Sequence, residues 1–218
     1  DFVQIDDLLA LRQRGVPVVL CMWEKPNHPP PLPSVAVDFF RAGMIAAEHL
    51  IKLGHRRIGA VVGSELSGNH IWRYRGFCEA MKRAGLEHAE NDAVFGHDTI
   101  DAGRNAGHAL LAAVPDLTAI FASNDLPALG VLQAAADLGL DVPNDLSVIG
   151  ITDIQLAHQV RPALTTVAIP IQESAELAVE MIMQMIGEKA SSTTAPNLRE
   201  ASAPRLVVRA STARARIR

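Results

Sequence analysis

Short apolar runs rich in β-branched residues alternate with helical patterns along the chain. Parallel strands that are covered on both faces are apolar without alternation. Runs of this kind span residues 17–22, 58–62, 119–122, 146–151, 164–169 and 206–208. Apolar side chains recur at helical spacing in the stretches 42–53, 77–84, 128–138 and 177–185. Strands that alternate with helices in this way predict an α/β fold with parallel sheets.

The ends of these helices carry recognisable residues. Gly54 and Gly85 stand where a helix commonly ends in a left-handed residue. Asp125 is the expected N-cap of the helix over 128–138, with Pro127 in its first turn.

Composition excludes several classes of protein. The 218 residues carry a formal net charge of −4, which is the wrong sign for a surface that holds DNA phosphates. No apolar run reaches 18 residues, and no secretion signal precedes the first strand, so we expect no membrane partner. Cys21 and Cys78 lie in apolar runs without a pairing pattern, which favours buried free thiols in a reducing cytoplasm.

Three stretches are predicted to be irregular. The proline-rich segment 25–33 favours an extended surface connector, and residues 190–196 favour a loop. The basic tail 211–218 carries Arg214, Arg216 and Arg218, and we expect it to be frayed and solvated rather than bound to nucleic acid.

Motifs for catalysis are missing from the sequence. It contains no GxGxxG, GxxxxGK[ST], GxSxG or HExxH pattern, and its eight histidines form no metal-ligand spacing. His49 and His55 flank a helix end, where capping and surface polarity explain them. We therefore expect no enzyme activity, no cofactor and no metal.

Polar residues follow two of the predicted strands. Asn124-Asp125 comes after one strand and Thr152-Asp153 after another, and ligands of open α/β folds bind at the carboxyl ends of strands. Both aspartates are equally explained as helix caps. Arg73 starts a helix, where it gains nothing from the helix dipole, although a surface arginine is the commoner explanation for the pattern alone.

Six ordered blocks resemble the LacI/GalR (lactose/galactose repressor) family of transcriptional regulators. These blocks are HLIKLGHRRIG from His49, RYRGF from Arg73, TAIFASND from Thr118, GLDVPNDLSVIG from Gly139, PALTTV from Pro162 and RLVVRAST from Arg205. The resemblance implies a periplasmic-binding-protein-like fold, with two Rossmann-like lobes joined by three crossovers. It places a partial N-terminal lobe at 1–37 and 168–195, and a C-terminal lobe at 38–167 and 196–210.

The resemblance also implies that the DNA-reading headpiece, the hinge helix and the start of the N-terminal lobe precede this chain. Operator DNA would then be bound only through that headpiece. A homodimer is expected through the helix over 126–138 and the segment 154–160. The candidate interface residues are Leu129, Gln133, Leu156 and Val160, and Leu129 is equally explained as a core residue.

The resemblance implies a small-molecule effector, sugar-like, in the cleft between the lobes. Arg73 and Asn124 match family positions that grip it. The other candidate residues are Thr152, Asp153, Asp98, Trp23 and Asn69. Asp98 stands where the family often has an aromatic ring that stacks on the ligand, and Thr152 and Met22 replace common aspartates. These departures indicate that the ligand is not an ordinary pyranose held in the usual way.

Two other classes compete with a cytoplasmic repressor. An extracytoplasmic sugar-binding protein of a transporter shares this fold, and a lipoprotein signal upstream would identify one. An enzyme on a Rossmann-like scaffold would need a nucleophile, a base or a metal constellation that the sequence does not show.

Overall fold

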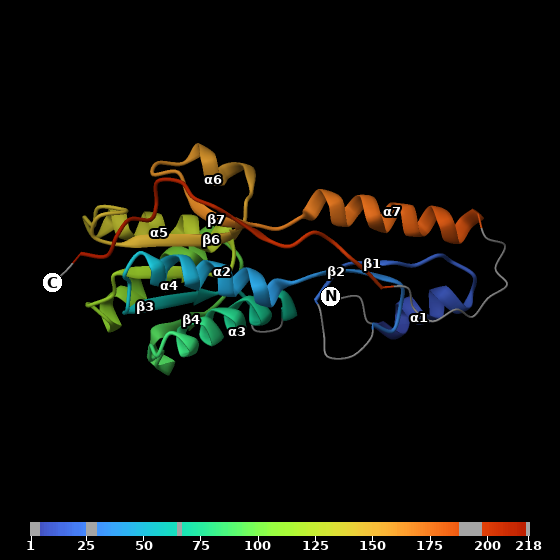
Figure 1. Ribbon diagram of the computed structural model, residues 1–218, viewed down its shortest axis with the longest axis horizontal. Coiled ribbons are helices and arrows are strands. Elements are labelled where there is room, and N and C mark those ends of the chain that lie inside the picture. Colours follow the sequence, from blue (N-terminus) through green and yellow to red (C-terminus); the bar gives the residue numbers. More distant parts are fainter. Residues whose placement is uncertain (1–4, 25–29, 65–66, 188–197, 217–218) are drawn as a thin grey trace. The chain divides into compact units, whose positions relative to one another are not determined.

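The computed structural model describes residues 5–24, 30–64, 67–187 and 198–216, and it divides the chain into two compact units (Figure 1). Unit 1 contains Asp1–Asp38 and Pro170–Ala203, and unit 2 contains Phe39–Ile169 and Pro204–Arg218. The chain passes between the units three times. The predicted α/β architecture with three crossovers is therefore confirmed.

The unit boundaries differ in detail from the expected ones. Asp38 belongs to unit 1, and Ala168 and Ile169 belong to unit 2. Residues 198–203 belong to unit 1 rather than to the larger unit, because β8 pairs with a strand of unit 1. The expected boundary at 195/196 lies outside the described residues, as do the loop at 190–196 and most of the connector at 25–33.

Unit 2 is built on a six-stranded sheet in the order β4-β3-β5-β6-β7-β9. Its strands are β3 (Ile58–Val62), β4 (Ala93–Phe95), β5 (Ala119–Ala122), β6 (Ser147–Thr152), β7 (Thr165–Ala168) and β9 (Arg205–Val207). All neighbouring pairs are parallel except β7 and β9. β3, β5 and β7 are buried along their whole length, as expected of strands covered on both faces.

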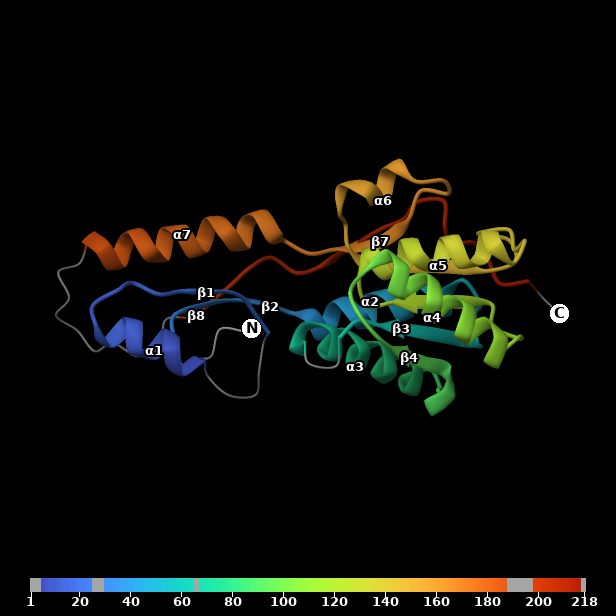
Figure 2. The ribbon, with the colours of Figure 1, turned by 180° about the vertical axis from the view of Figure 1, so that it is seen from behind.

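Helices cover both faces of this sheet. The helices of unit 2 are α2 (Phe39–Lys52), α3 (Gly68–Arg83), α4 (Ile100–Ala113), α5 (Asp125–Asp137) and α6 (Gln155–Gln159), with a 3-10 turn, η1 (Glu90–Asp92). α2 packs beside α3 on one face, and α4 packs beside α5 on the other (Figures 1 and 2). Phe77 of α3 stacks on Phe121 of β5 with 4.6 Å between ring centroids, which joins one helical layer to the sheet.

The α2–α3 contact depends on two glycines. A Cβ atom at Gly43 would overlap the carbonyl oxygen of Arg73, and one at Gly76 would overlap that of Phe40. The two helix backbones are therefore in direct contact. This close approach fixes the position of the α3 turn that carries Arg73.

Unit 1 has a three-stranded parallel sheet in the order β1-β2-β8. Its strands are β1 (Leu20–Glu24), β2 (Ser34–Val37) and β8 (Leu198–Glu200), and its helices are α1 (Ile5–Gln13) and α7 (Ile171–Gly187). The predicted apolar stripe of α7 packs inward, where Ala178 and Met181 join Val35 in a small core. Among the described residues, no helix of either unit is long and apolar enough to cross a membrane.

The C-terminal segment is ordered against unit 2, so the prediction of a frayed tail from residue 211 is wrong. Ser211 is buried, where its hydroxyl donates to Val148 O (2.6 Å) and accepts from Thr165 N (2.8 Å). Arg216 forms an ion pair with Asp145 at 2.6 Å. Backbone and hydroxyl hydrogen bonds hold this segment in place. Because such bonds require no apolar side chains, the sequence shows no periodicity that would predict this order.

His55 is also placed differently from its prediction, because it is only 2% exposed. Its ring bonds Thr118 Oγ1 at 2.9 Å and the carbonyl oxygen of Ala213 at 3.0 Å. Burial lowers the pKa of His55. Of the two free cysteines, Cys21 is exposed rather than buried, and Cys78 is half-buried.

Candidate functional site

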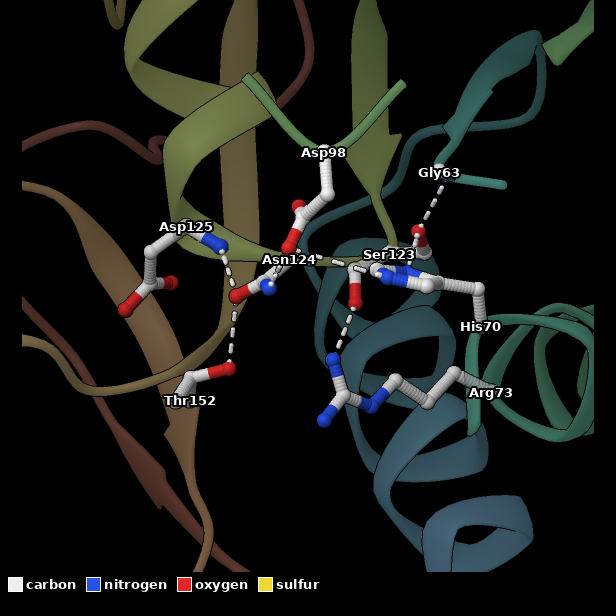
Figure 3. A network of polar contacts seen from close by, with 8 residues as sticks. All are labelled: Gly63, His70, Arg73, Asp98, Ser123, Asn124, Asp125 and Thr152. Carbon is white, nitrogen blue, oxygen red and sulfur yellow. Dashed lines mark hydrogen bonds and ion pairs between the residues drawn. The ribbon is translucent and has the colours of Figure 1, made fainter. Parts of the chain in front are cut away.

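The carboxyl ends of β3, β5 and β6 lie side by side in the sheet of unit 2, since these strands are parallel neighbours. Polar residues occupy or follow each end, and the start of α3 and the loop after β4 bring further side chains to the same place. Figure 3 shows the resulting group of eight residues. Its members are Gly63, His70, Arg73, Asp98, Ser123, Asn124, Asp125 and Thr152.

Arg73 is a buried cation in this group. It is 4% exposed, donates from Nη1 to Ser123 O at 2.8 Å, and stacks on Phe39 with 4.9 Å from Cζ to the ring centroid. Its Nε atom is buried without a hydrogen-bond partner among the described residues. Burial lowers the pKa of Arg73 to about 10, against the opposing effect of Asp98 and Asp125, so the side chain stays charged at neutral pH.

Asn124 follows β5 and caps α5. Its Oδ1 accepts from Asp125 N at 2.8 Å and from the hydroxyl of Thr152 at 2.7 Å. Its Nδ2 donates to Asp98 Oδ2 at 2.7 Å. The expected cap, Asp125, is instead the first residue of the helix.

Ser123, directly after β5, connects His70 and Arg73 of α3 to the sheet. Its Oγ accepts from Gly63 N at 2.9 Å and lies 2.8 Å from Nδ1 of His70. Since Oγ already accepts from Gly63, its own proton is available to Nδ1, and the ring proton of a neutral His70 then lies on Nε2. That nitrogen lies 3.7 Å from Asp98 Oδ2.

His70 is held in its neutral form. Burial lowers the pKa of His70, and the positive charge of Arg73 acts in the same direction, whereas Asp98 opposes it. The imidazole therefore lies between Ser123 and Asp98 without adding a second full charge beside Arg73.

The two aspartates that follow β5 and β6 are committed to other partners. Asp125 is buried, accepts from Thr166 Oγ1 (2.6 Å) and Ile154 N (2.9 Å), and burial raises its pKa. Asp153 forms an ion pair with Arg209 at 2.5 Å. The structure thus brings Thr152 to the group but ties the Asp153 carboxylate to the C-terminal segment.

The backbone is strained beside this site. Thr152 has φ 136° and Asp153 has φ 65°, both in the region that favours glycine. Such conformations persist only where surrounding contacts enforce them, and they cluster at ligand sites.

Two other candidate ligand residues lie apart from these contacts. Asn69 is half-buried in the first turn of α3. Trp23 belongs to β1 of unit 1, and its Nε1 is buried without a partner in the described part of the chain.

The candidate interface residues divide into two kinds. Leu129 is 5% exposed and belongs to the core of unit 2, together with partly buried Val160 at its margin. Gln133 and Leu156 are exposed, Leu156 to 43%. Burial of Leu129 favours its interpretation as a core residue.

Sequence reasoning did not single out His70 or Ser123. A signal was present for both, because His70 lies one helical turn before Arg73 and Ser123 directly precedes Asn124. Across the described ranges, no three His, Cys, Asp or Glu side chains gather closely enough to hold a metal ion.

Two α/β units, with polar residues gathered at the strand ends of one, define the class of periplasmic-binding-protein-like domains. Residues 47–212 match the family model described as a periplasmic binding protein-like domain. The chain belongs to the LacI family of transcriptional regulators.

Individual relatives support this assignment. A LacI family transcriptional regulator from Mycobacterium smegmatis has 35% sequence identity and a TM-score of 0.82, over 96% of this chain and 75% of that one. A LacI family regulator from Enterococcus faecium, solved with bound ribose, has 26% identity and a TM-score of 0.84, over 98% and 77% of the two chains.

Several curated relatives are named as transcriptional repressors or regulators. The HTH-type transcriptional repressor PurR of Pectobacterium carotovorum is 35% identical over 185 residues, which is 84% of this chain and 54% of the relative. The chain thus spans about half the length of the curated relatives that it matches first.

Proposed function

We propose that this chain is the effector-sensing and dimerisation part of a transcriptional repressor. A small sugar-like molecule would bind at the strand ends of unit 2. The observation that carries the proposal is the convergence of a buried Arg73 with Asp98 and Asn124 at the carboxyl ends of the unit 2 strands.

The unsatisfied polar atoms support a ligand at this place. Arg73 Nε and Asp98 Oδ1 are both buried without a hydrogen-bond partner among the described residues. An unsatisfied buried polar atom costs about 1–3 kcal/mol. A polyhydroxylated molecule carries both donors and acceptors, so it matches a site that offers a guanidinium and a carboxylate.

We propose that the site binds without catalysis, although Ser123, His70 and Asp98 superficially resemble a hydrolytic triad. The Ser123 hydroxyl is fully buried and accepts from Gly63 N, so no substrate carbonyl could reach it. The Asp98 carboxylate is 3.7 Å from the imidazole, too far for the hydrogen bond that orients a catalytic histidine.

The proposed mechanism is a shift between two states of the whole protein. The effector would bind one relative arrangement of the units more tightly than the other, and only that difference in affinity can shift the population. Through a homodimer, the shift would change how two DNA-binding headpieces fit a palindromic operator. Such a protein acts in the cytoplasm, where the DNA is.

The exposed residues Gln133 and Leu156 are the proposed contribution of unit 2 to the dimer. Leu156 of α6 is a large apolar side chain that is 43% exposed, and such a side chain suits a contact with a second copy of the chain. The names of the relatives favour this regulator over the binding component of a transporter.

Calorimetric titration of the full-length protein tests the proposal. The compounds are ribose first, because a related regulator was solved with it, and then a broad panel of sugars and sugar derivatives. At least one should bind saturably and should change the affinity for operator DNA in a fluorescence anisotropy assay. A panel in which no compound does both would contradict an effector-sensing role.

A further inference from the structure

The amide of Asn124 is almost fully used within the chain. Its Oδ1 accepts two hydrogen bonds, from Thr152 Oγ1 at 2.7 Å and Asp125 N at 2.8 Å, which is the capacity of an amide oxygen. One Nδ2 proton goes to Asp98 Oδ2 at 2.7 Å. Asn124 therefore has no free acceptor, and only one proton, to offer a ligand.

Asp98 has the opposite balance. An ionised carboxylate can accept about four hydrogen bonds, yet Asn124 supplies the one hydrogen bond that this carboxylate receives from the described side chains. Oδ1 is buried without a partner, and His70 Nε2, at 3.7 Å from Oδ2, is beyond hydrogen-bond distance. Although Oδ1 itself is buried, the side chain as a whole is 34% exposed, so a ligand can approach the carboxylate from its exposed side.

The neighbours of Asp98 hold the carboxylate in place. Asn124 is fixed by its two bonds to Thr152 and Asp125, and it holds Oδ2 in turn. His70, fixed by Ser123, limits the carboxylate on another side (Figure 3). A carboxylate that is held by its neighbours but lacks partners is suited to bind a group from outside the chain.

We propose that Asp98 is the side chain that selects the effector in unit 2, and that Asn124 is a positioning residue which acts through it. This inference rests on the proposed function and assigns the contacts within the site. It reverses the expectation that Asn124 itself recognises the ligand.

The chemistry of the ligand follows from this assignment. An ionised carboxylate has no proton to donate, so the ligand must bring a hydroxyl or an ammonium group to Asp98. A phosphate or carboxylate at this position would be repelled. The buried Arg73 on α3 has an unpartnered Nε, which would take an acceptor elsewhere on the same ligand.

An exchange of the two side chains tests the inference in the full-length protein. Asp98→Asn keeps an oxygen for Asn124 but replaces the other acceptor by a donor. Asn124→Asp keeps the oxygen that caps α5 but sets two carboxylates against each other. The double variant restores one amide–carboxylate bond with its polarity reversed.

The three variants have different expected results. Asp98→Asn should weaken binding at least about tenfold, because a charged hydrogen bond is lost, while Tm stays near that of the parent. Asn124→Asp should bind weakly at about pH 8 and recover toward about pH 5, since one shared proton relieves the repulsion. The double variant should regain the parent Tm without regaining affinity.

The pH profile must be compared with that of the parent protein. Four titratable or charged groups face the new carboxylate: Asp98, His70 and Arg73, with Asp125 at the start of α5. The parent keeps His70 but lacks the carboxylate pair, so recovery of binding in acid should appear in Asn124→Asp alone. A purely structural role of Asn124 would lower Tm and would produce no such recovery.

Ribose, glucosamine and glucose 6-phosphate serve as neutral, cationic and anionic probes, together with the compound of the calorimetric panel that binds most tightly. Glucose 6-phosphate should bind most weakly of the three. Unchanged affinity in Asp98→Asn, or restored affinity in the double variant, would overturn the inference and leave the sensor role intact. Failure of every compound to bind the parent would contradict both.

Discussion

The Nη1 atom of Arg73 lies 2.8 Å from the carbonyl oxygen of Ser123, so a buried cation on α3 is bound to the residue that directly follows β5. We expect Arg73→Met to separate ligand binding from stability. Methionine removes a charge that is costly to bury but leaves the carbonyl oxygen of Ser123 without its donor, so the unfolding free energy should fall by no more than about 1–3 kcal/mol. Effector affinity should fall at least about tenfold in calorimetry.

Arg73→Lys is the matched control for this variant. It keeps the charge but loses the planar fork that binds two acceptors at once, so binding should still weaken. Arg73 would be a structural residue instead if Arg73→Met unfolded the protein and Arg73→Lys bound the effector normally.

The glycine contact between α2 and α3 predicts a large cost for one methyl group. Gly43→Ala should lower the unfolding free energy by about 1–3 kcal/mol or more, because its Cβ would overlap the carbonyl oxygen of Arg73. Gly96→Ala is the control, since its Cβ would meet no atom within 4 Å. Equal urea midpoints for the two variants would show that the helices can separate at no cost.

Thr166→Val should show a stability loss that depends on pH. Burial raises the pKa of Asp125, and the hydrogen bond from Thr166 partly offsets this. A carboxyl whose folded pKa is raised stabilises the fold most in acid, and this stability is lost as the pH rises through the folded pKa. Removing the hydroxyl raises the pKa of Asp125 further. The loss in Thr166→Val should therefore approach about 1–3 kcal/mol near neutral pH and shrink at about pH 4.

Denaturant unfolding at several pH values measures this difference, with the parent protein as reference. A loss that stays constant from acid to neutral pH would mean that Asp125 is not the partner through which Thr166 stabilises unit 2.

Mild acid should loosen the C-terminal segment through His55. Burial lowers the pKa of His55 below its ordinary 6.5. The stability that this neutral ring contributes is present above the unfolded value, and it is lost as the pH falls toward the lowered folded pKa. His55→Gln should therefore flatten the decrease of Tm below about pH 6.5. His158→Gln, on the exposed side of α6, should leave the profile as in the parent.

The flattening will be partial, because burial lowers the pKa of three other histidines in the same direction. These are His49, His70 and His88. A profile of His55→Gln that coincides with the parent would show that the ring is not linked to the acid response.

The proposed dimer surface makes opposite predictions for two leucines. Leu156→Glu places a charge on an exposed position, so it should shift the full-length protein toward monomers in sedimentation while leaving Tm nearly unchanged. Leu129→Ala removes a core side chain and should cost about 2–5 kcal/mol. Its assembly should be unaffected while it stays folded. A Leu156→Glu protein that remains dimeric would exclude this surface.

Much of the fold could be predicted because a parallel strand that is buried on both faces is a continuous apolar run. Such a run can be recognised without knowing which face each residue lies on. The predicted strand at 58–62 coincides with β3, and that at 146–151 differs from β6 by one residue.

α4 was missed because its packing face is made mostly of small residues. Gly103 and Gly107 lie against α5 there, and Leu110 is the one large side chain among the buried residues of this helix, too few to show a helical period. β4 and β8 have three residues each, too few for a pattern.

The candidate site could be predicted only in part. Strand ends indicate which residues gather, and the structure brings Arg73, Asn124, Asp98 and Thr152 together as that rule implies. Which polar side chains bond to each other depends on their distances in the folded structure. The spacing of residues in the sequence does not give these distances. The ion pair of Asp153 with Arg209, 56 residues later, is an example.

Unit 2 is completed by a segment that is synthesised after all of unit 1, and this order affects folding during translation. Its sheet is completed by β9, and its buried Val148, Thr165 and His55 bond to residues 211–213. These residues leave the ribosome only after all of unit 1 has been made. A nascent chain must therefore keep an open sheet edge and unpaired polar groups in unit 2 until residues 205–213 emerge. The chaperone dependence of unit 2 during synthesis should end when β9 and the segment after it are released.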